Sequence, residues 1–224
     1  MDYRQIPNLI TTARLILAIV FFVILSWYQY EGRGHSTLLT IGFFTCLIAI
    51  STDYIDGYLA RLWKVESGFG RVVDPFVDKI LVLGSFIFFA GKNFIIATEV
   101  VDGQIYVAHT ITGVTPAMVV VILGRELLVT SIRGLAEKSG VSFGADKWGK
   151  LKMVMQSVTI LVIITYVYFL EVLQRRASPE AYEAYRSYAG MFRDICIWTT
   201  LVVTVGSAWG YLVRSVQFMR GAGR

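Results

Sequence analysis

The chain has 224 residues, of which 55% are hydrophobic and 17% are charged, and its mean hydropathy is +0.61. So apolar a composition excludes an ordinary soluble domain and indicates an integral membrane protein. The formal net charge of +5 suits an anionic membrane surface, and no nucleic-acid partner is expected. Both cysteines, Cys46 and Cys196, lie in apolar stretches, so a disulfide framework is not expected.

Six stretches are long and apolar enough for transmembrane helices, which need about 20 mostly apolar residues each. They cover residues 8–29, 36–59, 76–98, 115–137, 150–172 and 195–215. The sequence therefore predicts an all-α, polytopic integral membrane protein with six transmembrane helices, forming a single membrane domain over residues 1–224. Between the last two spans, the amphipathic segment 173–194 is expected to lie along the membrane interface.

Lysine and arginine are distributed unequally between the two sides that six crossings define. Fifteen of the 21 fall on the side that holds both termini, the 60–79 loop and the 125–152 region. The other six fall on the opposite side. Because cytoplasmic segments carry an excess of lysine and arginine, both termini are predicted to lie in the cytoplasm.

Four aspartates interrupt the apolar pattern around the junction of the second and third spans. Asp53 and Asp56 are three residues apart and share one helix face, as do Asp74 and Asp78, which are four apart. The short connection between the spans is expected to bring the two pairs together. Four carboxylates at one place repel each other unless cations bind them, and their hard oxygen atoms suit Mg²⁺, Mn²⁺ or Ca²⁺.

Each aspartate also has a structural interpretation. Asp74 precedes a proline and suits the N-cap of a helix that begins there. Asp53 and Asp56 could pair with the nearby cations Arg61 and Lys79. Taken together, however, the four favour a functional site, because acidic residues within membrane segments are usually functional.

Small residues and a cation accompany the aspartates. Gly57 and Ala60 lie one turn apart beside Asp56, and Gly70 lies in the connection, where a ligand or backbone can approach closely. Arg61 is a fixed cation that suits a phosphate. Carboxylate-held metal beside an arginine and a glycine-lined groove indicates phosphoryl-transfer chemistry, although the small residues could also serve close helix packing.

The spacing D-x2-D-G-x2-A-R-x8-G-x3-D-x3-D is the signature of the CDP-alcohol phosphotransferases, which this chain resembles over nearly its whole length. The signature is complete here as Asp53, Asp56, Gly57, Ala60, Arg61, Gly70, Asp74 and Asp78. Such a match at eight fixed positions arises by chance about 10⁻¹⁰ of the time per starting point. The six-span layout also fits this family.

The resemblance implies a mechanism in which an alcohol attacks the β-phosphorus of a CDP-linked lipid and CMP leaves. It implies two bound ions, Mg²⁺ or Mn²⁺, held by the four aspartates, with Asp78 also taking the proton of the attacking hydroxyl. It places Gly57, Ala60, Arg61 and Gly70 at the site of the cytidine nucleotide of the CDP-lipid. Members of the family tend to be homodimers, and a homodimer is expected here.

Three further stretches resemble the bacterial phosphatidylglycerophosphate synthases within this family: "IPNLITTARL" (6–15), "GRELLVTSIRG" (124–134) and "WGKLKM" (148–153). This resemblance implies CDP-diacylglycerol as the donor and sn-glycerol 3-phosphate as the acceptor. It also implies a multi-pass protein of the bacterial inner membrane, in contact with membrane lipid, with the active site facing the cytoplasm.

A basic cluster agrees with an anionic acceptor. Five cations near the cytoplasmic ends of the fourth and fifth spans are candidates for binding the acceptor phosphate: Arg125, Arg133, Lys147, Lys150 and Lys152. The alternative is that they anchor the helices at the interface.

Two other functions remain open from the sequence. In the first, the chain is a member of the same family that uses inositol phosphate, serine or phosphatidylglycerol as the acceptor. A divalent-cation transporter would also hold metal with aspartates, but its site is expected near the bilayer midplane and often within repeated halves. Here the acids lie at helix ends and no internal repeat is seen.

Overall fold

The computed structural model describes residues 6–32, 35–63, 68–101, 104–138 and 147–222. Within these ranges the side chains are described except at 6–8, 53–63, 68–75, 78, 97–101, 104–108, 136–138, 147, 211 and 213–222. The side chains of the four signature aspartates are among these exceptions, so the positions of the aspartates are known from the backbone alone.

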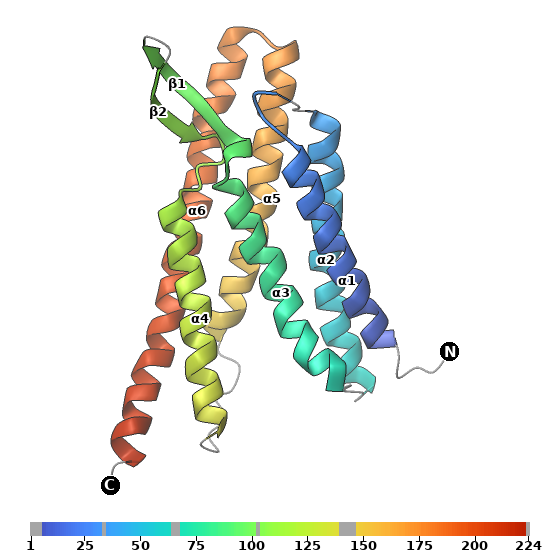
Figure 1. Ribbon diagram of the computed structural model, residues 1–224, viewed down its shortest axis with the longest axis vertical. Helices are drawn as coiled ribbons and strands as arrows, with labels where there is room; N and C mark the ends of the chain where they lie inside the picture. The colour runs from blue at the N-terminus through green and yellow to red at the C-terminus, as the bar shows by residue number, and fades with distance from the viewer. Residues whose placement is uncertain (1–5, 33–34, 64–67, 102–103, 139–146, 223–224) are drawn as a thin grey trace.

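Six α-helices make up most of the described chain and run along the long axis of an elongated bundle (Figure 1). They are α1 (Ile6–Trp27), α2 (Ser36–Trp63), α3 (Gly68–Phe89), α4 (Pro116–Lys138), α5 (Lys147–Arg176) and α6 (Pro179–Ala222). We call the end where α2 finishes and α3 begins the aspartate end. The opposite end, which carries two short strands and the turn between α5 and α6, is the hairpin end (Figure 1). The predicted all-α class is confirmed.

Three of the described helices are long and apolar enough to cross a membrane, in the stretches Leu9–Trp27, Trp148–Arg176 and Pro179–Gly210. Two further helices contain shorter apolar stretches, Ser36–Thr52 in α2 and Lys79–Phe89 in α3. The chain is thus an all-α membrane protein. Six crossings stay a prediction.

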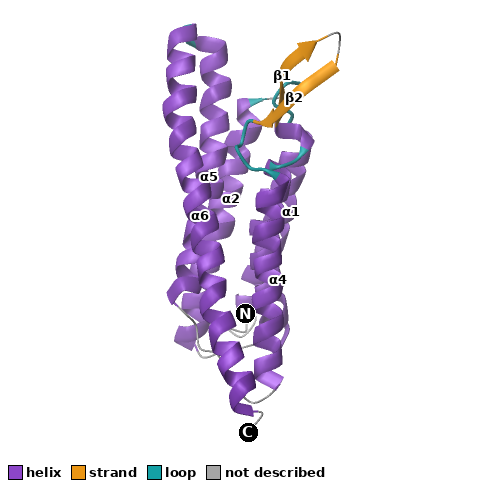
Figure 2. Cartoon of the chain, turned by 90° about the vertical axis from the view of Figure 1, so that its left-hand side faces the viewer, coloured by secondary structure: helices purple, strands orange, loops and turns teal. Residues whose placement is uncertain are grey.

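The expected third span, 76–98, is wrong at its C-terminal end. α3 stops at Phe89, a 3₁₀ turn follows at Lys92–Phe94, and the chain then forms an antiparallel hairpin of β1 (Ile95–Val101) and β2 (Gln104–Thr110). The register pairs Ile95 with Thr110 and Val101 with Gln104. Figure 2 shows this hairpin projecting at one end of the helices. The β-branched residues of β1 and the Asp-Gly pair at 102–103 are sequence signals of a β-hairpin. The prediction of the third span used hydropathy alone and therefore missed them.

The expected interfacial segment, 173–194, is also wrong. Its first residues end α5, and the rest form the first turns of α6, which continues without a break to Ala222. Ser178 caps the new helix, because its Oγ accepts a hydrogen bond from the backbone N–H of Ala181 at 3.3 Å. Pro179 occupies the first helical position, where a missing N–H costs nothing. The segment therefore extends an α5–α6 hairpin of helices along the bundle axis (Figure 1).

Packing inside the bundle depends on close helix approach and on polar links between helices. A Cβ at Gly84 of α3 would collide with the ring of Phe22 on α1, so a larger residue there would force this ring to move. The hydroxyls of Thr159 on α5 and Thr200 on α6 lie 2.8 Å apart and are buried. Beyond the end of α1, the Tyr28 hydroxyl donates to Glu171 of α5 at 3.3 Å, and burial, reinforced by Glu171, raises the pKa of Tyr28.

Candidate active site

The signature residues divide between two helices that meet at the aspartate end. Asp53, Asp56, Gly57, Ala60 and Arg61 lie on α2, and Gly70, Asp74 and Asp78 lie on α3. Only residues 64–67 separate the helices, so the last turns of α2 and the first turns of α3 are neighbours (Figure 1). The side chains of all eight lie outside the described ones. The backbone nevertheless places each pair of aspartates about one helical turn apart.

The connection between α2 and α3 is shorter than the sequence indicated. α3 begins at Gly68, which puts Gly70 in its first turn rather than in a loop. The alternative of Asp74 as an N-cap is wrong, because the helix begins six residues before it. Asp74 and Asp78 thus lie about one turn apart on one face of a continuous helix. This arrangement holds the two carboxylate positions more rigidly than a loop would.

The aspartate end of α1 contributes two buried polar residues. Thr11 and Arg14 are three residues apart, share a helix face and are almost completely buried. α1 packs against both α2 and α3. A buried arginine therefore adds positive charge to the same end of the bundle as the aspartates.

Arg125 and Lys152 converge on one carboxylate in the interior of the bundle. Arg125 Nη1 lies 3.0 Å and Lys152 Nζ 2.5 Å from the same oxygen, Oε1 of Glu126. The three side chains are 7–9% exposed. Charge-assisted hydrogen bonds of this length, in a site with little water, fix the two cations side by side. The trio carries a net charge of +1.

α6 completes this cluster. Arg125 Nη2 donates to Ser207 Oγ at 2.7 Å, and Ser207 Oγ donates to the Thr204 carbonyl, also at 2.7 Å. The third donor of the guanidinium, Nε, is buried and has no hydrogen-bond partner in the described part of the chain. Buried donors are rarely left unsatisfied, so this atom remains available to an acceptor outside the described chain.

A hydrogen-bond chain connects this cluster to α3, the helix that carries Asp74 and Asp78. Lys79 of α3 donates to Thr130 Oγ1 at 2.5 Å, and Thr130 donates to the Glu126 carbonyl at 2.6 Å. Lys79 follows Asp78 directly in the sequence. The cationic cluster and the Asp78 segment of α3 therefore lie at the same level of the bundle.

The five cations proposed for the acceptor phosphate are not all gathered in one place. Arg125 and Lys152 are buried together, whereas Arg133 and Lys150 are exposed. The side chain of Lys147, at the first position of α5, lies outside the described ones. Lys150 and Lys152 are two residues apart, so on a helix they face different sides.

Three residues of this site, Glu126, Thr130 and Ser207, were not singled out from the sequence, and Lys79 was considered only as a partner of Asp53 and Asp56. One signal was available, since a glutamate next to an arginine within an apolar run is expected to be buried and paired. The other three carry no such signal. Lysine, threonine and serine are ordinary at helix ends and interfaces, and only the packing of α3, α4 and α6 brings them together.

Comparison with known proteins agrees with the signature. A family model described as CDP-alcohol phosphatidyltransferase matches residues 4–206. A protein of Bacillus subtilis is 27% identical over 223 residues, covering 96% of this chain and 97% of the relative. One of Cereibacter sphaeroides is 26% identical over 241 residues, covering 96% and 97%. One of Haemophilus influenzae is 33% identical over 160 residues, covering 70% and 73%. All three are named CDP-diacylglycerol–glycerol-3-phosphate 3-phosphatidyltransferase.

Proposed function

We propose a reaction for this chain from one premise: the chain belongs to the CDP-alcohol phosphatidyltransferase family. The enzyme transfers the phosphatidyl group from CDP-diacylglycerol to sn-glycerol 3-phosphate, which gives phosphatidylglycerol phosphate and CMP. The observation that carries this proposal is the complete signature on the adjoining ends of α2 and α3. The names of relatives that align over nearly the whole chain support the choice of acceptor.

The donor set suits two divalent ions. Asp53, Asp56, Asp74 and Asp78 offer only hard carboxylate oxygens, and the backbone puts them in two pairs at one end of the bundle. These four residues would hold Mg²⁺ or Mn²⁺. When bound, the ions would neutralise charge on the pyrophosphate and stabilise the departing CMP.

The protein residues carry out the remaining steps. Gly57, Ala60, Arg61 and Gly70 bind and orient the cytidine nucleotide of the donor. A hydroxyl of glycerol 3-phosphate attacks the β-phosphorus, so that a new P–O bond forms while the bond to CMP breaks. Asp78 accepts the hydroxyl proton as the general base.

The buried cationic cluster is the best candidate for the acceptor phosphate. Arg125 and Lys152 lie together at Glu126, and the Arg125 Nε is a buried donor without a hydrogen-bond partner in the described chain. The link from Lys79 to Thr130 keeps this cluster level with Asp78. The acceptor phosphate can therefore bind while its hydroxyl reaches the base. Arg133, Lys147 and Lys150 are proposed to attract the anion from the more exposed surface.

Orientation and assembly follow from the charge distribution and the family resemblance. The aspartate end, which holds most of the lysines and arginines, faces the cytoplasm. The relatives named above are bacterial, and we place the enzyme in the bacterial inner membrane, as a homodimer. A transporter is disfavoured, because the aspartates lie at helix ends rather than at a broken helix near the midplane.

The test is CMP release by the purified full-length protein with CDP-diacylglycerol and one acceptor at a time. We expect release with sn-glycerol 3-phosphate and little with inositol phosphate, serine or phosphatidylglycerol. EDTA should abolish it, and Mg²⁺ or Mn²⁺ should restore it. Preference for another acceptor would overturn the assigned substrate, and full activity in exhaustively chelated enzyme would overturn the metal-dependent mechanism.

A further inference from the structure

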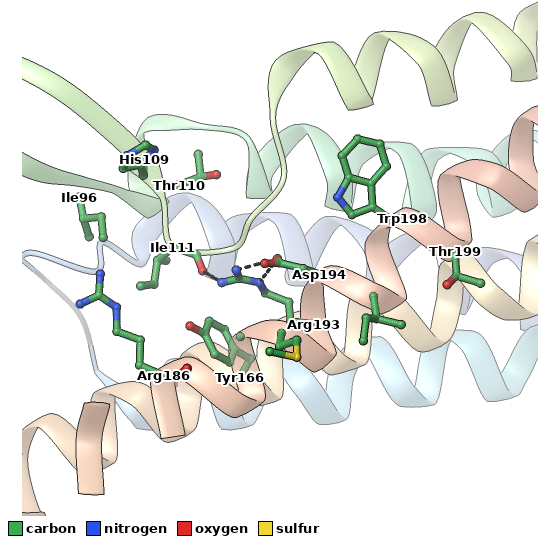
Figure 3. A pocket seen from close by; sticks show the side chains of 14 residues that line it. Ile96, His109, Thr110, Ile111, Tyr166, Arg186, Arg193, Asp194, Trp198 and Thr199 are labelled. Carbon is green, nitrogen blue, oxygen red and sulfur yellow. Dashed lines mark hydrogen bonds and ion pairs between the residues drawn. The ribbon is translucent and has the colours of Figure 1, made fainter. Parts of the chain in front are cut away.

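A cavity of about 690 Å³ lies at the hairpin end (Figure 3), at the opposite end of the bundle from the signature residues (Figure 1). Its walls are the end of β2, Tyr166 of α5 and the early turns of α6. Pockets that bind small molecules typically measure about 300–1,000 Å³. This hairpin pocket is therefore large enough for a ligand, and the proposed reaction does not use it.

One wall of the hairpin pocket holds a rigidly placed cation. Arg193 Nη1 donates to the Ile111 carbonyl at 2.7 Å, and its Nη2 lies 2.7 Å from Asp194 Oδ1. The guanidinium carbon also lies 4.5 Å from the centre of the Tyr166 ring. Gly113 has a φ of +75°, and a Cβ there would come within 2.8 Å of Arg193 Nε. The loop thus closes tightly over a charge that is already oriented.

A second cation stands at the mouth of the pocket with its donors available. Arg186 is exposed, and the ion pair it makes with the exposed Glu183 is long, at 3.5 Å. Exposed ion pairs of this kind contribute little to stability, so another anion can readily replace the glutamate. Figure 3 shows Arg186 and Arg193 on either side of the Tyr166 ring. The pocket lining itself holds these two arginines and one acid, Asp194, while Glu183 lies beside Arg186 outside the lining.

The other end of the pocket is apolar and faces outward. Met191, Ile195 and Trp198 line it and are 57–60% exposed, although all three are large hydrophobic residues. Their spacing of four and three residues puts them on one face of α6, inside the candidate membrane stretch Pro179–Gly210. Arg186 precedes Trp198 by 12 positions, or about 18 Å along the helix. Polarity therefore falls along α6 from the end of the bundle towards the membrane interior.

We propose that the hairpin pocket binds one phospholipid with an anionic headgroup. The lipid phosphate binds Arg186 beside Arg193, and an acyl chain covers Met191, Ile195 and Trp198. A free phosphate would satisfy the two arginines but leave the apolar face uncovered, whereas a lipid matches both halves. This site is separate from the donor site, because it lies at the opposite end of the bundle from the aspartates (Figure 1).

The test uses the fluorescence of Trp198, which lines the pocket. The full chain is reconstituted with its four other tryptophans, Trp27, Trp63, Trp148 and Trp209, replaced by phenylalanine. Vesicles contain either brominated phosphatidylcholine alone or increasing fractions of brominated phosphatidylglycerol. One arginine near the membrane surface attracts an anionic lipid by about fivefold, so we expect about fivefold preferential quenching by phosphatidylglycerol.

Two variants at the hairpin end serve as test and control. Arg186→Gln should remove the preference, whereas Arg176→Gln removes an exposed arginine that does not line the pocket and should leave it unchanged. Millimolar inorganic phosphate should also leave the preference unchanged, because it offers no acyl chain. Equal quenching by both lipids, persistence of the preference in Arg186→Gln, or its loss on adding phosphate would each overturn the proposal.

Native mass spectrometry of the intact wild-type chain gives the same comparison without replacing tryptophans. Lipid retained by the wild type and by Arg176→Gln, but lost from Arg186→Gln, would support the site. Equal retention by all three proteins would overturn it.

Discussion

Two arginines, one nearer each end of the bundle, pair with the acid that follows them in the sequence, and their surroundings differ. Glu126 is 7% exposed and shared with Lys152, so Arg125 lies in a buried cluster with one unpartnered donor, its Nε, within the described chain. Asp194 is 49% exposed, and Arg193 is also held by the Ile111 carbonyl and the Tyr166 ring. The first arrangement is the one that we propose for the acceptor phosphate. The second mainly ties α6 to α5 and to the chain that follows the β-hairpin.

The proposed chemistry lies at the aspartate end, so the largest effect on activity is expected there. Asp78→Asn removes the proposed base while three carboxylates remain to hold the donor. It should lower kcat by at least about 10²-fold, the low end for loss of a general base. Steady-state CMP release measures this. Glu180→Gln, an exposed carboxylate change in the first turn of α6, is the control and should leave kcat within about twofold. An equal loss of kcat in both variants would contradict the assignment of the chemistry to the aspartate end.

The buried arginine should determine acceptor binding. Arg125→Ala removes a charge-assisted contact to the acceptor phosphate and should raise KM for glycerol 3-phosphate about 10- to 100-fold, as expected for a hydrogen bond to a charged group. KM for CDP-diacylglycerol should change little. Arg133→Ala, an exposed cation on the same helix, should have a smaller effect. If Arg125→Ala instead weakened only donor binding, the cluster would belong to the donor site.

The paired arginine at the hairpin end should affect stability rather than activity. Arg193→Ala loses its hydrogen bond to Ile111 and its contact with Tyr166, which should lower the free energy of unfolding by about 1–3 kcal/mol. Thermal melts of the detergent-solubilised protein measure this, with the exposed Arg176→Ala as control. Both KM values should match those of the wild type at permissive temperature. A change in either KM would couple this arginine to the active site.

The smallest expected change concerns topology alone. Ser178, at the turn between α5 and α6, and Lys64, in the connection between α2 and α3, belong to opposite ends of the bundle. Each is replaced by cysteine in a background without Cys46 and Cys196. In intact cells an impermeant thiol reagent should label Ser178→Cys and not Lys64→Cys. Activity should be unchanged in both variants. Labelling of Lys64→Cys and not of Ser178→Cys would place the aspartates outside the cytoplasm.

The sequence by itself determined the features that depend on local spacing and composition. Apolar stretches of sufficient length predicted the helices, and the fourth, expected at 115–137, is found at Pro116–Lys138. The aspartate signature indicated the family, which the match over residues 4–206 confirms. These features are readable because helix periodicity and fixed motif spacing are properties of neighbouring residues. The roles of the individual signature residues stay predictions.

Tertiary structure decided what depends on contacts between distant segments. Arg125, Lys150 and Lys152 look alike in the sequence, and only the packing of α4, α5 and α6 buries the first and third against Glu126 and leaves Lys150 exposed. The segment 173–194 was amphipathic enough for an interface, yet α6 extends through it because Tyr166 and Tyr185 stack and Arg193 bonds to the Ile111 carbonyl. Hydropathy cannot distinguish a polar group facing water from one satisfied by a partner far along the chain, because both make the same local pattern.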